Sequence, residues 1–187
     1  METQTPSVRN TRGSRAVKIL FAVGLLSVCL ITFGVFALGA REPLEHQVQA
    51  ERVIPAPLDS VWARLVDFGA YPAWRPELGM VKVGGQPGDS LTYMEVIGGR
   101  EGMMFLVEEM QPPHRLVVRN ISDKLPLAQL WDYELVRDPG GCRVRITETG
   151  TVNSVSLRFY FRYVNSHNES IERRLDLLEK SYNRDPS

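Results

Sequence analysis

Cysteine and histidine are scarce in this sequence, and their scarcity excludes two kinds of structure. The 187 residues include two cysteines, Cys29 and Cys142, and three histidines. Cys29 lies in an apolar run near the N-terminus and Cys142 lies far beyond it, so we expect no disulfide bond within the chain. One cysteine and three scattered histidines match none of the ligand spacings of zinc sites. We therefore predict no metal site and no cofactor.

A basic surface is also missing from most of the chain. Basic and acidic residues number 22 each, so the net charge is zero. Four basic residues precede position 19 against a single acidic one, Glu2, and the remainder is therefore slightly acidic. Domains that bind nucleic acid carry a clustered basic face. We predict that this protein has no nucleic-acid partner.

Catalytic motifs are missing as well. The sequence has no nucleophile elbow, no phosphate-binding loop and no convincing acid–base pair. We therefore assign no catalytic residue, and these absences favour a binding protein over an enzyme.

The chain does contain one long apolar run, Ile19 to Ala40, without a charged residue. A helix of this length covers the hydrocarbon core of a bilayer, which is about 30 Å thick. A cleavable signal peptide is the alternative, with Ala37-Leu38-Gly39 as its cleavage site. The apolar core of a signal peptide spans only about 7–15 residues, so the run is too long for one. We predict an uncleaved transmembrane anchor.

The basic residues around this run predict its orientation. Four of them lie within about 15 residues on the N-terminal side, whereas Arg41 and Arg52 follow on the C-terminal side. The domain is therefore expected outside the cytoplasm, in a periplasm or an equivalent lumen. The expected organisation is a basic cytoplasmic tail over 1–18, a transmembrane helix over 19–40, a spacer over 41–46 and one domain over 47–183.

The pattern of the domain predicts an α+β fold. A strand over 47–54 is followed by a helix that opens at Pro57 and by a short helical turn over 68–74. Six strand-like runs separated by glycine and proline turns predict an antiparallel meander, over 80–83, 90–97, 103–110, 115–121, 130–136 and 143–148. One long amphipathic helix over 156–182 is expected to close the domain, with Asn168 as the single polar residue on its apolar stripe.

Several motifs carry a family resemblance. The first group consists of Val53–Pro57, Val61-Trp62, Asp67-Phe68 and Tyr71–Pro76, and the second of Glu109–Leu116, Gly140–Val144 and Glu148–Gly150. In this order the motifs resemble the polyketide cyclase/dehydrase-like branch of the SRPBCC (START-like) superfamily. The resemblance implies a helix-grip fold, in which a curved antiparallel sheet wraps around the C-terminal helix. It also implies a cavity for a hydrophobic small molecule or a lipid.

Strand parity and the helix stripe supply the candidate cavity residues. They are Trp74, Tyr93, Glu95, Phe105, Trp131, Tyr133, Glu148, Phe161 and Asn168. A buried Asn168 amide needs a partner or a ligand, unless the helix bends near residues 165–166 and turns the amide to solvent. Glu95 and Glu148 either act as an acid or a base, or reach water or pair with Arg119 or Arg145. Trp74 either contacts the ligand or only packs over the cavity mouth.

None of the histidines is assigned to a site. His46 follows the apolar run and is expected to be solvated, and His167 lies off the apolar stripe of the last helix. Three functions stay open: a membrane-anchored binding or carrier domain, a cyclase, dehydratase or hydrolase that acts on the same kind of ligand, and a non-catalytic interaction domain of the cell envelope.

Overall fold

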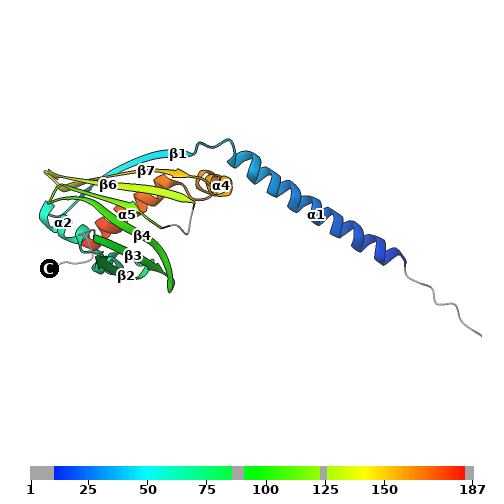
Figure 1. Ribbon diagram of the computed structural model, residues 1–187, viewed down its shortest axis with the longest axis horizontal. Coiled ribbons are helices and arrows are strands. Elements are labelled where there is room, and N and C mark those ends of the chain that lie inside the picture. Colours follow the sequence, from blue (N-terminus) through cyan, green and yellow to red (C-terminus); the bar gives the residue numbers. More distant parts are fainter. Residues whose placement is uncertain (1–10, 86–90, 123–125, 184–187) are drawn as a thin grey trace, which may run out of the picture.

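The computed structural model describes residues 11–85, 91–122 and 126–183. Figure 1 shows a long helix, α1, that projects away from a domain in which an antiparallel sheet wraps around one helix. This is the α+β, helix-grip arrangement that the sequence predicts.

The sheet has seven strands, each antiparallel to its neighbours, in the order β1-β7-β6-β5-β4-β3-β2. Their bounds are β1 Glu45–Ile54, β2 Leu78–Gly85, β3 Leu91–Ile97, β4 Arg100–Gln111, β5 Arg115–Asn120, β6 Leu127–Asp138 and β7 Gly141–Val152. Each predicted strand is present, and most are longer than predicted. The register shifts once in each of the pairs β2–β3, β3–β4 and β4–β5, and such irregularities bend a sheet.

Side chains alternate between the two faces of the sheet. On β6 and β7, Tyr133, Leu135, Val144 and Ile146 are buried, whereas their sequence neighbours point to the other face. The inner face of the sheet packs against helix α5, His167–Asn183, through Ile171, Leu175 and Leu178. The main core therefore lies between the sheet and α5.

Two short helical segments cover one end of this core. Helix α2, Leu58–Val66, is present but begins one residue later than predicted, with Pro57 at its N-cap, and it buries Val61, Trp62 and Leu65. The 3-10 turn η1, Phe68–Ala70, leads into α3, Tyr71–Trp74. The Asp67 side chain accepts a hydrogen bond from the Ala70 backbone N–H and so stabilises the start of this second segment.

The prediction of one unbroken C-terminal helix over 156–182 is wrong. Helix α4, Val155–Tyr163, ends before a break, and α5 begins at His167. The Ser166 side chain accepts a hydrogen bond from the Glu169 backbone N–H, so the chain caps a new helix in a new direction. The apolar spacing of the two helices therefore does not form one stripe. Asn168 is exposed to solvent, which confirms the alternative that the chain bends near residues 165–166 and turns this amide away from the core.

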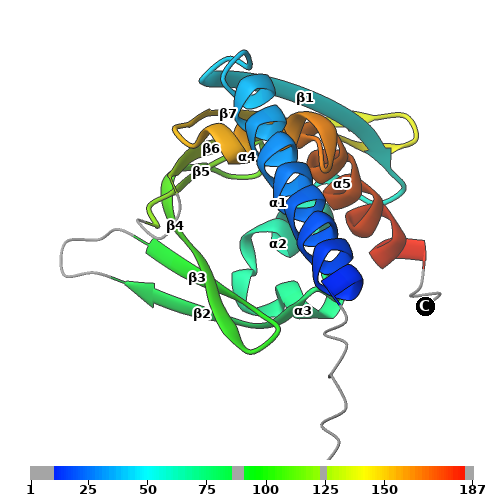
Figure 2. The same ribbon diagram turned by 90° about the vertical axis from the view of Figure 1, so that its right-hand side faces the viewer.

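Helix α1, Thr11–Gly39, contains a stretch of 25 residues, Arg15–Gly39, that is long and apolar enough to cross a membrane. Its large side chains are exposed, for example Phe21 at 74% and Phe33 at 72%. Helix α4 lies beside the C-terminal end of α1, the end next to the domain (Figures 1 and 2). There Arg158 of α4 donates a hydrogen bond to the Gly39 carbonyl at 3.1 Å.

Candidate functional site

A hollow of about 540 Å³ lies between α5 and the turn that joins α3 to β2. Its walls come from Arg75, Glu77, Ile97, Asn165, Glu169, Ser170, Arg173, Arg174 and Leu177. Several of these side chains are charged, and two of the arginines extend into the region between the sheet and α5. This hollow is the candidate ligand site.

The first of these arginines, Arg75, forms a buried ion pair with Glu95 on β3. Its two Nη atoms bind the two carboxylate oxygens of Glu95, with Nη2 at 3.2 Å from Oε2. Arg75 is 5% exposed and Glu95 is 1% exposed, so both charges are removed from water. Arg75 Nε also binds Glu77 at 2.9 Å. The pair places a fixed, neutralised charge at the inner end of the hollow.

The second arginine, Arg174 of α5, is half-buried and contacts aromatic groups instead of a carboxylate. Its Nη1 donates to the Tyr133 hydroxyl at 2.5 Å, and its guanidinium lies 4.1 Å from the centre of the Trp131 ring. Within the described residues it forms no ion pair. Burial lowers the pKa of Arg174, but electrostatic interactions with Tyr133 and Glu95 outweigh burial and raise it, so the side chain stays cationic.

Aromatic rings form the wall behind these charges. The Tyr93 ring stacks between Phe68, at 4.4 Å between centroids, and Phe105, at 5.1 Å, and Tyr71 meets it edge-on. Burial raises the pKa of Tyr71 and of Tyr93, so both phenols stay neutral. The Tyr71 hydroxyl donates to the Leu65 carbonyl at 2.7 Å. These four rings belong to the hydrophobic core behind the hollow and are not among the side chains that line it.

A second polar group surrounds Glu148 of β7, whose side chain is fully buried. Its Oε1 lies 3.1 Å from His46 Nε2, 3.0 Å from His167 Nδ1 and 2.5 Å from Gln129 Nε2. Burial raises the pKa of Glu148, but the hydrogen bonds from His167, His46 and Gln129 outweigh it and lower the pKa to about 2. Glu148 is therefore an anion and a weak base at neutral pH.

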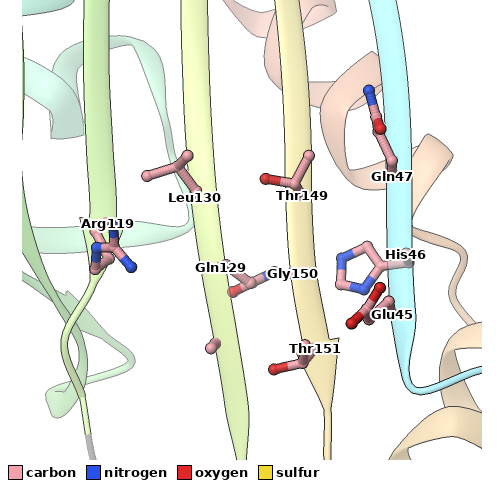
Figure 3. Close-up of a pocket in the computed structure, with 10 residues that line it drawn as sticks. Glu45, His46, Gln47, Arg119, Gln129, Leu130, Thr149, Gly150 and Thr151 are labelled. Atoms are coloured by element: carbon pink, nitrogen blue, oxygen red, sulfur yellow. The ribbon is translucent and has the colours of Figure 1, made fainter.

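Two further hollows lie outside the core. Figure 3 shows one of about 490 Å³ over β5, β6, β7 and β1, with Arg119, Thr149 and Thr151 among its lining residues. The other, of about 550 Å³, lies between α2, α3 and α5 and is lined in part by Trp74. Arg119 already pairs with Glu108, and Arg64 in the second hollow bonds the Ser181 hydroxyl and lies over the Tyr182 ring. Arg174, in contrast, contacts Trp131 and Tyr133 on the inner face of the sheet. We therefore place the candidate site at the hollow beside Arg174.

The predicted cavity residues fall into four sets. Five of them are buried on the inner face of the sheet near the two arginines, and these are Tyr93, Glu95, Phe105, Trp131 and Tyr133. Trp74 is buried in α3 against Tyr71. Glu148 belongs to the second polar group, where the Phe161 ring of α4 lies 4.2 Å from the His167 ring. Asn168 is on the surface and joins neither group.

The partners predicted for the two glutamates are wrong. Arg119 and Arg145 point to the outer face of the sheet, where they bind Glu108, Glu51 and Glu134. Because side chains alternate between the two faces of a strand, the two arginines lie on the outer face and the two glutamates on the inner face, so they cannot contact each other. Neither glutamate reaches bulk water, because Glu95 is 1% and Glu148 0% exposed.

Sequence reasoning missed Arg174, His46 and His167. Arg174 follows Ile171 by three residues and precedes Leu178 by four, which places it on the buried side of α5, and this spacing could have identified it. His46 was expected to be solvated, but its side chain is only 14% exposed. The first two residues of β1 already pair with β7, which holds His46 against the sheet. No sequence signal places His167 beside His46, since their contact depends on the break before α5.

These observations agree with a comparison of the sequence with protein families. The profile of the family described as "Polyketide cyclase / dehydrase and lipid transport" matches residues 45–174. The chain belongs to this family. Among curated protein sequences, none matches the chain. The family assignment covers the whole sheet and the first half of α5, and therefore both polar groups.

Solved structures share the fold of this family member. TTHA0849 from Thermus thermophilus is 21% identical with a TM-score of 0.60, over 76% of this chain and 100% of that chain. A START superfamily protein from Mycobacterium smegmatis is 17% identical with a TM-score of 0.55, over 75% and 97%. The di-domain ARO/CYC StfQ of the steffimycin biosynthetic pathway is 15% identical with a TM-score of 0.60, over 75% and 52%. The present chain thus spans about half of that di-domain protein. At these identities the likeness concerns the fold.

Proposed function

We propose that this protein is a membrane-anchored binding or carrier domain, and that its hollow beside α5 holds a hydrophobic small molecule or a lipid with an acidic group. The observation that carries the proposal is Arg174. The half-buried Arg174 guanidinium lies over the Trp131 ring, binds the Tyr133 hydroxyl and forms no ion pair within the described residues, so it is available to pair with an anion. The lining of the hollow is mostly polar and charged, with Ile97 and Leu177 as its apolar side chains, and the Trp131 ring lies against the Arg174 guanidinium.

The geometry around Arg174 favours an amphipathic ligand. Arg75 is already neutralised by Glu95, so it adds no free charge, whereas Arg174 is neutralised by no neighbouring carboxylate among the described residues. The ligand's acidic group would bind the Arg174 guanidinium, and its apolar body would lie against the aromatic wall around Trp131 and Tyr133. A guanidinium binds planar acidic groups through two parallel hydrogen bonds.

The same residues favour binding over acid–base catalysis. Both carboxylate oxygens of Glu95 are bound by the Nη atoms of Arg75. The pKa of Glu148 is lowered to about 2, so this carboxylate is a weak base near neutral pH. The Tyr71 and Tyr93 phenols are neutral and bury their rings in the core. These groups position a ligand and stabilise the fold.

The exposed surface of α1 supports the anchor. A helix that leaves apolar side chains exposed along its whole length is unstable in water and is stabilised in a bilayer. Helix α4 packs beside the end of α1 and exposes Tyr160 and Tyr163, with Arg162 on the same short helix and the exposed Val164 directly after it. Aromatic and basic residues are typical of the membrane–water interface. The domain would therefore lie close to the membrane that supplies its ligand.

Native mass spectrometry of the full chain after gentle detergent extraction tests the ligand. We expect a stoichiometric small molecule on the wild-type protein and its loss in Arg174→Met. Arg137→Met is the matched control, because Arg137 is exposed at the far end of β6 and its replacement removes the same charge. The proposal fails if the wild type carries no ligand, or if Arg174→Met retains it as fully as Arg137→Met does.

A fusion experiment tests the proposed orientation. The four basic residues that precede the apolar run Ile19–Ala40 favour a cytoplasmic N-terminus, which would place the domain on the opposite side of the membrane. An alkaline phosphatase fused after Ser187, which is active only outside the cytoplasm, should therefore be active. Activity of a cytoplasmic reporter at the same position would reverse the proposed topology without affecting the ligand proposal.

A further inference from the structure

The second polar group joins three segments that are far apart in the sequence. His46 comes from the start of β1, Glu148 from β7 and His167 from the first residue of α5. One ligand atom from each residue lies within 4.8 Å of the other two, and Glu148 is fully buried. We propose that His46, Glu148 and His167 form a binding site for a divalent transition-metal ion, with Zn²⁺ as the best match.

The ligand set and its spacing support this assignment. Two imidazoles and one carboxylate are a set that zinc uses when its fourth position stays open. With metal–ligand bonds of about 2.0–2.1 Å, a tetrahedral ion needs ligand atoms about 3.3 Å apart. The two nitrogens lie 3.1 and 3.0 Å from Glu148 Oε1, close to that spacing. An ion would replace the protons that the imidazoles now share with the carboxylate.

The surroundings of the three residues make room for the cluster and hold it. His46 pairs across the sheet with Gly150, and a Cβ at Gly150 would lie 2.9 Å from the His46 ring (Figure 3). The same Cβ would lie 2.2 Å from the Ala128 carbonyl oxygen, so only glycine fits there. Gln129 of β6 pairs with Gly150 of β7, and its side-chain amide donates a hydrogen bond to Glu148 Oε1. Such outer contacts orient the ligands of metal sites.

Hydrogen bonds within the group leave part of Glu148 unsatisfied. Three donors meet Oε1, whereas Oε2 is buried and has no hydrogen-bond partner among the described residues. A buried acceptor without a partner costs about 1–3 kcal/mol in stability. A bound cation neutralises the whole carboxylate, so it relieves this cost in a way that the imidazole hydrogen bonds do not.

The site also offers an open coordination position. A small pocket of about 140 Å³, lined by His46, His167 and Phe161, adjoins the two imidazoles. It has room for a water molecule as the fourth ligand. The two imidazole rings are now stacked, with centroids 3.7 Å apart, and must tilt away from each other when the ion enters. His46 follows the link from α1, and His167 follows the break before α5, so both rings sit at segment ends.

Metal titration of the full chain tests the site. The protein is purified in detergent micelles without a histidine tag, treated with a chelator and titrated with Zn²⁺ by calorimetry. The visible spectrum of the Co²⁺ form provides a second readout. The variants His46→Asn and His167→Asn retain a side-chain N–H for Glu148 but lack the imidazole. His114→Asn, on the turn between β4 and β5, is the matched control because it removes the remaining histidine.

We expect one Zn²⁺ per chain in the wild type and in His114→Asn. Each cluster variant should bind Zn²⁺ at least about tenfold more weakly and lose the Co²⁺ bands. Zn²⁺ should also raise the unfolding temperature of the wild type, because it binds only the folded chain. The proposal is overturned if the folded wild type shows no saturable binding, or if both cluster variants bind Zn²⁺ as tightly as His114→Asn. None of these results depends on the ligand of the hollow beside Arg174.

Discussion

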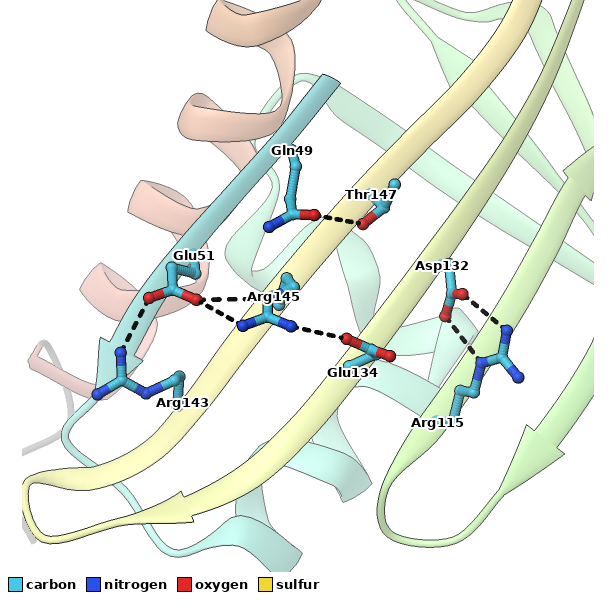
Figure 4. Close-up of polar contacts among 8 residues, drawn as sticks. All are labelled: Gln49, Glu51, Arg115, Asp132, Glu134, Arg143, Arg145 and Thr147. Atoms are coloured by element: carbon cyan, nitrogen blue, oxygen red, sulfur yellow. Dashed lines mark hydrogen bonds and ion pairs between the residues drawn. The ribbon is translucent and has the colours of Figure 1, made fainter. Parts of the chain in front are cut away.

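The two faces of the sheet use charged residues in opposite ways. On the outer face, Glu51 binds Arg143 at 2.9 Å and Arg145 at 3.1 Å, and Arg115 binds Asp132 at 2.8 Å (Figure 4). These side chains are partly exposed and form a ladder across neighbouring strands. On the inner face, Arg75–Glu95 and the group around Glu148 are almost completely removed from water.

This difference indicates that the stability of the fold depends on the buried charges more than on the exposed ones. Exposed pairs contribute little to stability, since water and salt screen them and flexible side chains lose entropy when they pair. Buried charges cost several kcal/mol in desolvation, at about the scale of a small domain's whole stability, and persist only with well-placed partners. Substitutions on the inner face should therefore affect stability and ligand binding, and those on the outer face should affect neither strongly.

Breaking the buried ion pair should have the largest effect. Arg75→Met leaves Glu95 charged and buried without its partner, so the free energy of unfolding should fall by about 3–5 kcal/mol. Urea unfolding of the full chain in micelles, followed by tryptophan fluorescence, measures this loss, since Trp62, Trp74 and Trp131 are all buried in the domain. The outer-face variant Arg145→Met should lose only a small fraction as much. Equal losses in the two variants would contradict the comparison.

Two adjacent residues of β6 give the same comparison for apolar side chains. Leu135 is 0% exposed on the inner face and Val136 is 50% exposed on the outer face. Leu135→Ala leaves a cavity in the core and should cost about 2–5 kcal/mol of stability. Val136→Ala should change stability by no more than about 0.5 kcal/mol. Urea midpoints of both variants measure the difference, and similar midpoints would show that β6 does not separate an inner from an outer face.

The buried thiol of Cys142, on the inner face, should make a smaller contribution to stability that depends on pH. Burial raises its pKa from 9.0 to about 11, with a further contribution from Asp138. The unfolded chain therefore loses this proton first, so the associated stability is complete below about pH 9 and disappears as the pH rises toward 11. The stability of the wild type relative to Cys142→Ala should fall over that interval in urea titrations. A constant difference would place the thiol in contact with water.

The smallest effect is expected on the outer ladder. Glu51→Gln removes the carboxylate that Arg143 and Arg145 share, but these groups are exposed. The hydrogen bonds from Arg145 and Arg143 lower the pKa of Glu51, which burial raises only in part. The unfolding temperature should drop slightly at low salt, and the difference from wild type should shrink as salt is added. A large drop in the unfolding temperature that persists in high salt would show that the ladder contributes strongly to stability, contrary to this prediction.

The secondary structure of the domain could be predicted because each signal is local. Alternating apolar residues predicted every strand, and glycine and proline turns predicted the antiparallel meander, since the period of two and the turn chemistry depend on neighbours in the sequence. The inward positions of Tyr93, Phe105, Trp131 and Tyr133 follow from the same alternation. The single C-terminal helix failed because the break before His167 depends on a Ser166 cap that competes with the continuing apolar spacing.

The sequence by itself determined the long apolar helix, the order of the strands along the chain and the inward faces of the sheet, because local periodicity specifies them. Only the tertiary structure decided which charges meet. It brings Arg75 to Glu95, leaves Arg174 against Tyr133, and places His46 and His167 on Glu148. These contacts join residues from different strands and helices. They depend on sheet register and on the direction of α5, and no local pattern encodes either.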